Sequence, residues 1–222
     1  MTASDRLLRV GLVLAVAGTA VQTLIHLVNL FALGDRYYHL DVSAEQTAFS
    51  WASTVATFAA ACAALLLAAR PDTPRRGRML LLAAALAYLS LDDFIELHER
   101  LGDWVGDELG LPEAIGPRIW VIVYLPVLVA AALLLVWSAL SSPPRPRRYQ
   151  LAGIGLLVAA VLSEGLGVLT KLLEEHGIET PHRLRAGLEE GLELGGWILI
   201  AAGLVAVLYA GPVSDSDRSP DP

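Results

Sequence analysis

Six apolar stretches, each long enough to cross a lipid bilayer, constrain this chain more than any other feature. They are residues 7–33, 47–69, 79–101, 115–140, 151–173 and 188–209. A helix needs about 20 consecutive, mainly apolar residues to span the hydrocarbon core. The stretches are rich in Leu, Ala and Val and lack the two-residue alternation of barrel strands. The sequence therefore predicts an all-α integral membrane protein, a bundle of six transmembrane helices.

Composition supports this class and excludes one kind of partner. Hydrophobic residues make up 55% of the chain, which is high for a soluble domain, and the formal net charge is −7. Because no basic patch is present, we expect no nucleic acid as a partner. The first apolar stretch is span-length rather than signal-length, so it is expected to remain as a helix. The lipid bilayer is the expected surrounding, with the protein multi-pass in the inner (plasma) membrane.

Basic residues predict how the bundle is oriented. The two short connections at residues 70–78 and 141–148 are rich in arginine, and cytoplasmic loops of membrane proteins carry such an excess. Both termini are therefore expected in the cytoplasm. Residues 1–211 are predicted to form one transmembrane domain, and the polar residues 212–222 a disordered cytoplasmic tail.

Two acidic clusters lie at ends of apolar stretches that this orientation places in the outer half of the bilayer. The first contains Asp92, Asp93, Glu96, Glu99 and Arg100, and the second contains Glu189, Glu190 and Glu193. In one continuous helix, Asp92, Glu96 and Glu99 share a face, with Asp93 and Arg100 beside it. His98 is then expected to point away from that face.

Other helices place polar residues at the same depth. His26 lies on a stripe with Thr19, Gln22 and Asn29, and Glu164 aligns with Lys171 seven residues later. Polar groups at membrane depth usually face the bundle interior. Glycines at 187, 191 and 195 recur every four residues, which predicts a close helix contact beside the second acidic cluster.

The spacing of the acids suggests a cation site. Glu96 and Glu99, like Glu190 and Glu193, form a Glu-x-x-Glu pair, an arrangement similar to that of di-metal carboxylate bundles. The predicted metal ligands are Asp92, Glu96, Glu99, Glu164, Glu190, Glu193 and His26, with Asp93, Arg100, Lys171 and Glu189 in supporting positions. Oxygen-rich ligation with one imidazole suits iron, manganese or zinc. Carboxylates crowded into one layer can also bind protons.

Two resemblances accompany these motifs. The segment Glu190-Gly191-Leu192-Glu193 is similar to the Glu-x-x-Glu motif of iron permeases, in which an arginine stands where this chain has Glu189. The Asp-Asp…His-Glu helix at 92–99, followed by the Glu-Glu-x-x-Glu helix at 189–193, resembles a group of uncharacterised bacterial multi-helix membrane proteins. The first resemblance implies handling of a metal ion, and the second implies a shared site without an activity.

Three hypotheses about function follow. The first is a cation-binding membrane protein that transports a metal ion or is coupled to protons. The second is a membrane metalloenzyme with a carboxylate-bridged metal, acting at the outer leaflet, which agrees with the nearly apolar inner halves of the helices. The third is a structural subunit of a membrane complex, or a homo-oligomer, in which Arg100, Lys171, Arg183 and Arg185 satisfy the acids.

Overall fold

The computed structural model describes residues 2–42, 47–71, 73, 75–111, 119–175 and 180–210, without the side chains of residues 164, 165, 167–175 and 180–182. The predicted tail at 212–222 lies outside these residues. Seven α-helices carry the fold: α1 (Ala3–Leu27), α2 (Ala48–Ala69), α3 (Arg76–Ile95), α4 (Leu97–Glu108), α5 (Trp120–Ser141), α6 (Pro144–Glu175) and α7 (Thr180–Tyr209). Two short helical turns, Val28–Ala32 and Tyr38–Leu40, follow α1. The described residues contain no strand, so the predicted all-α class is confirmed.

Four segments are long and apolar enough to cross a membrane. They are Ala3–Ala32, Ala48–Ala69, Trp120–Ser141 and Arg183–Tyr209. A membrane protein is therefore the class that these helices fit. The other two predicted spans correspond to α3 and α6, so the count of six spans remains a prediction.

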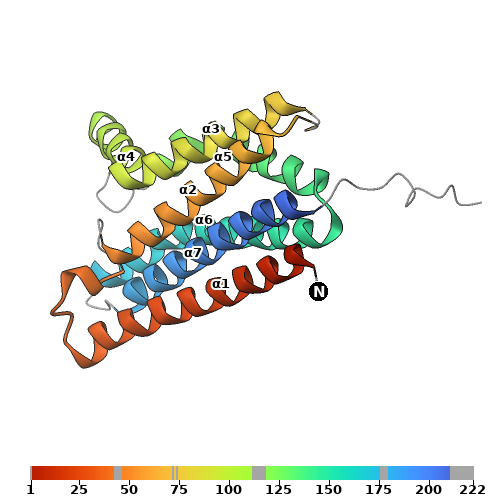
Figure 1. Cartoon of the computed structure of the whole chain (residues 1–222). Helices are drawn as coiled ribbons and strands as arrows, with labels where there is room; N and C mark the ends of the chain where they lie inside the picture. Colours follow the sequence, from red (N-terminus) through yellow and green to blue (C-terminus); the bar gives the residue numbers. More distant parts are fainter. Residues whose placement is uncertain are drawn as a thin grey trace, which may run out of the picture.

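Helix α7 lies at the centre of the bundle. It packs against α1, α2 and α6, whereas α3 and α5 lie on the far side of α2 and α6 (Figure 1). The main apolar core joins α2, α3, α5 and α7. Its members are Ala60, Ala61, Ala63, Ala64, Leu67, Ala68, Met79, Leu82, Ala83, Leu86, Leu135, Trp197, Ile200 and Leu204. Small side chains dominate the α2 face, which lets the helices approach closely.

The predicted glycine contact is confirmed between α7 and α1. A methyl group built on Gly191 would lie 3.0 Å from Thr19 Cγ2, and one built on Gly187 would lie 3.0 Å from His26 Cδ2. The Thr19 hydroxyl donates a hydrogen bond of 2.9 Å to the Gly191 carbonyl oxygen. The polar stripe of α1 therefore faces α7 because glycine makes room for it.

Several helix ends differ from the predicted boundaries. Residues 141–148 were expected to be a loop, but α6 begins at Pro144, where a proline fits the first helical turn because its missing N–H is not needed. Helix α7 begins at Thr180, eight residues before the expected start. The connection between the predicted spans 79–101 and 115–140 is helical in its first part, since α4 continues to Glu108.

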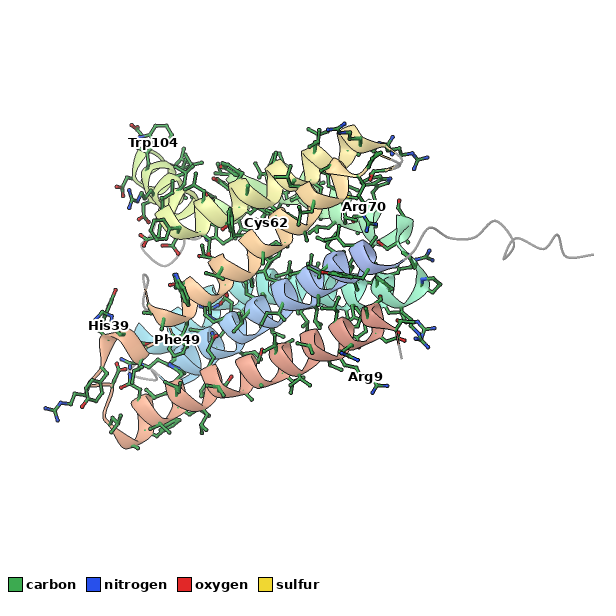
Figure 2. All side chains as sticks on the ribbon, viewed as in Figure 1. Arg9, His39, Phe49, Cys62, Arg70 and Trp104 are labelled. Carbon is green, nitrogen blue, oxygen red and sulfur yellow. The ribbon has the colours of Figure 1, made fainter. Side chains whose placement is uncertain are left out.

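The largest correction concerns the predicted continuous helix at 79–101. It breaks at Glu96, which has left-handed backbone angles (φ 56°, ψ 37°), and α4 leaves in a new direction (Figure 1). The physical reason lies in the sequence of α4, where Asp103, Asp107 and Glu108 would make a longer membrane helix costly. Trp104 on α4 points away from the bundle (Figure 2), as expected for an amphipathic helix at a membrane interface.

Because of the break, we expect glycine at position 96 to stabilise the protein, whereas glycine inside a helix usually destabilises it. Left-handed angles cost an L-residue about 1–2 kcal/mol, and glycine avoids that cost. Glu96→Gly should therefore raise the melting temperature of the purified protein, and Glu96→Val should lower it. Thermal unfolding in a mild detergent measures both. In a continuous helix, glycine would instead destabilise the protein by about 1 kcal/mol. A melting temperature of Glu96→Gly below that of the wild type would therefore refute the break.

Candidate functional site

A cavity of about 530 Å³ opens at the end of the bundle where α3 ends and α7 begins. We call this end the acidic end, because six carboxyl groups from three helices line the cavity there. They belong to Asp92, Asp93, Glu99, Glu189, Glu190 and Glu193. The imidazole of His98 and the guanidinium of Arg185 line the same space, together with Trp120 and Tyr124 of α5.

Asp92 is the centre of a hydrogen-bond network at this end. The residue is 5% exposed, and its carboxylate accepts hydrogen bonds from His98 Nδ1 at 2.8 Å and from the Tyr124 hydroxyl at 2.7 Å. The hydroxyl oxygens of Tyr124 and Tyr88 are 2.5 Å apart. Because Tyr124 gives its proton to Asp92, Tyr88 donates to Tyr124. The network therefore runs from the cavity through α5 to the surface of α3.

The expectation that His98 points away from the acids is wrong. It assumed one straight helix, whereas the break at Glu96 turns α4 so that the imidazole returns to Asp92. Burial lowers the pKa of His98, but the hydrogen bond to Asp92 and the charges of the neighbouring carboxylates outweigh burial and hold it above its usual value of 6.5. The His98 ring also makes an edge contact with Trp120, at 4.5 Å between ring centres.

Asp93 connects the site to α2. It accepts a 2.5 Å hydrogen bond from the Thr54 hydroxyl, and the Ser90 hydroxyl donates to the Thr54 carbonyl oxygen at 2.9 Å. The side of α2 that carries Thr54 therefore faces the end of α3. This contact places Asp92 and Asp93 on two different sides of the same helix end.

Helix α7 supplies the opposite wall. Glu193 accepts a 3.2 Å hydrogen bond from Trp197 Nε1, one turn further along the helix. Arg185 forms an ion pair with Glu189, and Arg183 forms one with Asp35 beyond α1. The two arginines thus pair with acids, as the structural hypothesis expects, although one of those acids lies outside the cavity.

The structure does not bring all the predicted ligands together. His26 is 1% exposed and does not line the cavity; its Nε2 lies 3.1 Å from the Arg183 carbonyl oxygen, and its Nδ1 accepts a 3.4 Å hydrogen bond from the Val42 N–H. Glu96 is at the helix break and Arg100 is exposed on α4, and neither lines the cavity. The side chains of Glu164 and Lys171 lie outside the described part of the chain.

Four of the predicted ligands do meet in one space: Asp92, Glu99, Glu190 and Glu193. Within the described side chains, however, no three Asp, Glu, His or Cys residues converge on a single point as metal ligands must. The acids instead surround a cavity. This arrangement can take up protons or a larger cation without closing on one atom.

Four further residues line the site: Tyr124, Trp120 and Trp197 were not predicted as members, and Arg185 was named only in the structural hypothesis, as a partner of the acids. Tyr124 is a polar side chain within an apolar stretch, so the sequence did carry a signal for it. Trp120 and Trp197 were not distinguishable from interface or core aromatics. Arg185 lies one turn before Glu189, an ion-pair spacing that places the two side chains together.

Comparison with known proteins gives a family but no activity. A family model described as a domain of unknown function (DUF8692) matches residues 7–208. No curated protein and no solved structure matches the chain.

Proposed function

The chain belongs to the DUF8692 family, whose function is unassigned, and we propose that it is a cation-binding integral membrane protein that transports a metal ion or protons. The observation that carries this proposal is the cavity at the acidic end. Six carboxyl groups line it, against the one guanidinium of Arg185 and the imidazole of His98 among the described residues. Several ionised carboxylates cannot remain close together in a poorly hydrated space, so they must take up protons or cations.

Access from one side supports transport. Beyond the cavity, α2, α3 and α7 pack through an apolar core that includes Leu82, Leu86 and Ile200, each fully buried. A site that is open at one end and closed by apolar packing at the other resembles one state of an alternating-access transporter. Discontinuous helices beside a site are typical of such proteins, and α3 is interrupted at Glu96 next to the cavity.

The proposed orientation places the acidic end outside the cell and both termini in the cytoplasm, in the inner (plasma) membrane. The beginning of α1 and the end of α7 lie at the same end of the bundle (Figure 1), which agrees with six crossings by α1, α2, α3, α5, α6 and α7. Arg9 and Arg70 lie toward that end, and His39 lies at the other (Figure 2). Arginine on the cytoplasmic side follows the usual charge bias.

The cation itself can be a metal ion or a proton. Iron, manganese or zinc is favoured by the paired glutamates at 190 and 193 and by their similarity to the iron-permease motif. Proton binding needs no convergence of ligands, and the Asp92–His98 pair already shares a hydrogen bond that a proton can occupy. Both ions therefore remain within the proposal.

Ion uptake into proteoliposomes tests this function. We expect the double variant Glu190→Gln/Glu193→Gln to lose at least about tenfold of metal or proton uptake, which corresponds to about 1.4 kcal/mol of lost cation stabilisation. The matched control is Asp103→Asn/Glu108→Gln, which removes two carboxylates from the exposed surface of α4 and should transport normally. Equal uptake by both double variants would contradict the acidic end as the transport site, and no uptake by the wild type would contradict transport.

One observation favours a second candidate, an enzyme at the outer leaflet. His98 is held on Nδ1 by the buried carboxylate of Asp92, which is the arrangement that orients a general base. Its ring lies on the cavity wall beside Glu99. Cation binding without uptake in the proteoliposome assay would favour this candidate over the transporter.

A further inference from the structure

We propose that the ligand of this cavity is a long-chain amine, with its ammonium group among the carboxylates of the acidic end and its alkyl chain between α5 and α6. The inference rests on cation binding at the proposed site and goes beyond the proposed function, because it gives the same carboxylates an organic cation as a ligand in addition to the transported ion. The evidence is the part of the cavity that a metal ion or a proton would not use.

That part is long and apolar. Along α5 the cavity lining runs from Val121 to Leu135, a distance of about 21 Å at 1.5 Å per residue. Most of the apolar side chains beyond the acids come from α5 and α6, among them Leu128, Ala132, Leu135, Ile154, Leu157 and Val158. A volume of about 530 Å³ is in the range of sites that bind organic molecules. It greatly exceeds the space that one dehydrated ion needs.

The apolar part is also open along its side. Leu125 and Val129 of α5 and Val158 and Leu162 of α6 line the cavity and yet are 47–68% exposed. A side chain that is both lining and exposed marks the rim of an opening. This rim lies between two helices whose outer surfaces are apolar, so the opening faces the lipid chains. A membrane-dissolved molecule can enter there without crossing water.

The acidic end selects a cationic head group. Carboxylates of α3, α4 and α7 can accept the N–H donors of an ammonium group, and an anionic head group such as a carboxylate or phosphate would be repelled. The rings of Trp120 and Tyr124, at 6.5 Å between centres, line the same end and can add cation–π attraction. The cavity therefore has carboxylates and aromatic rings at one end and, at the other, an apolar channel as long as an alkyl chain. This combination fits an amphipathic amine.

Tryptophan quenching by brominated chains tests the proposal. The reporter protein carries Trp51→Phe, Trp104→Phe and Trp137→Phe, which leaves the two cavity residues Trp120 and Trp197. It is reconstituted in phosphatidylcholine nanodiscs and titrated with octadecylamine brominated in mid-chain. The alcohol and the carboxylic acid of the same chain are the comparison ligands. We expect the amine to quench at concentrations at least about tenfold lower than either comparison ligand, a difference of about 1.4 kcal/mol.

Two variants separate the head group from the chain. Glu190→Gln/Glu193→Gln should abolish the preference for the amine, and Asp103→Asn/Glu108→Gln should leave it unchanged. Ala132→Phe, which fills the apolar part, should weaken binding of all the long chains. If the amine, the alcohol and the acid quenched the tryptophan fluorescence equally, the quenching would reflect ordinary lipid contact and the proposal would be overturned. Undiminished quenching by the amine in Ala132→Phe would also overturn it. Neither result would affect the ion-uptake test of the proposed function.

Discussion

Replacing Asp92 by alanine is expected to lower the unfolding free energy by about 3 kcal/mol, because one substitution removes the buried acceptor of two donors. His98 and Tyr124 both hydrogen-bond to this carboxylate, at 2.8 and 2.7 Å. A buried donor left without a partner costs about 1–3 kcal/mol. For a chain of this size the melting temperature in detergent should fall by on the order of 10 °C. Tyr124→Phe, which removes one donor and leaves the carboxylate, should cost about 1 kcal/mol.

The pH dependence distinguishes this network from simple loss of volume. The pKa of His98 is raised in the folded protein, so the charged pair stabilises the fold fully below the usual value of 6.5 and this contribution is lost as the pH rises through the raised pKa. The melting-temperature gap between wild type and Asp92→Ala should therefore be widest at mildly acidic pH and narrow toward alkaline pH. The control is Asp103→Asn, which removes one carboxylate charge at an exposed position of α4. Its melting temperature should stay close to that of the wild type at every pH. If the melting-temperature difference between wild type and Asp92→Ala did not change with pH, stabilisation by a charged Asp92–His98 pair would be ruled out.

Much of the fold could be read from local properties of the sequence. Helix content and the positions of the long apolar helices follow from hydropathy, which needs only the residues within each segment. A close helix contact of α7 was predictable because glycine at 187, 191 and 195 forms one small face, whereas its partner α1 was not predicted. For the site, the two acidic clusters predicted Asp92, Glu99, Glu190 and Glu193 as neighbours, since charged groups at membrane depth must face inward.

The remaining features depend on backbone geometry that periodicity does not encode. A helical wheel assumes constant rotation per residue, and the left-handed angles of Glu96 break that assumption two residues before His98. One residue therefore reversed the predicted direction of the imidazole and removed Glu96 from the cavity lining. His26 shows a different limit: its depth was compatible with a ligand, but backbone groups of residues 42 and 183 engage both its ring nitrogens. Spacing within one helix cannot reveal such a contact.

Replacing Gly153 by alanine is expected to cost about 2 kcal/mol, within the range for overpacking a close contact. A methyl group on Gly153 would lie 2.6 Å from the Gly196 carbonyl oxygen and 2.8 Å from Ile200 Cγ1. The first of these atoms belongs to the backbone, so α6 and α7 must separate to admit the methyl group. Gly155→Ala on the same helix is the matched control, because nothing lies within 4 Å of its added methyl group. Alanine favours a helix over glycine by about 1 kcal/mol, so the control should be stable or stabilised.

The same substitution should also alter the cavity, since α6 and α7 form two of its walls. Ile154, the next residue after Gly153, and Trp197, the next after Gly196, both line it. Separation of the helices at this crossing should therefore change the quenching of the cavity tryptophans and weaken long-chain binding, while Gly155→Ala changes neither. Thermal unfolding and the quenching titration measure the two effects on one sample. If Gly153→Ala and Gly155→Ala proved equally stable, the close α6–α7 crossing would be wrong, and with it the apolar wall that the proposed alkyl chain requires.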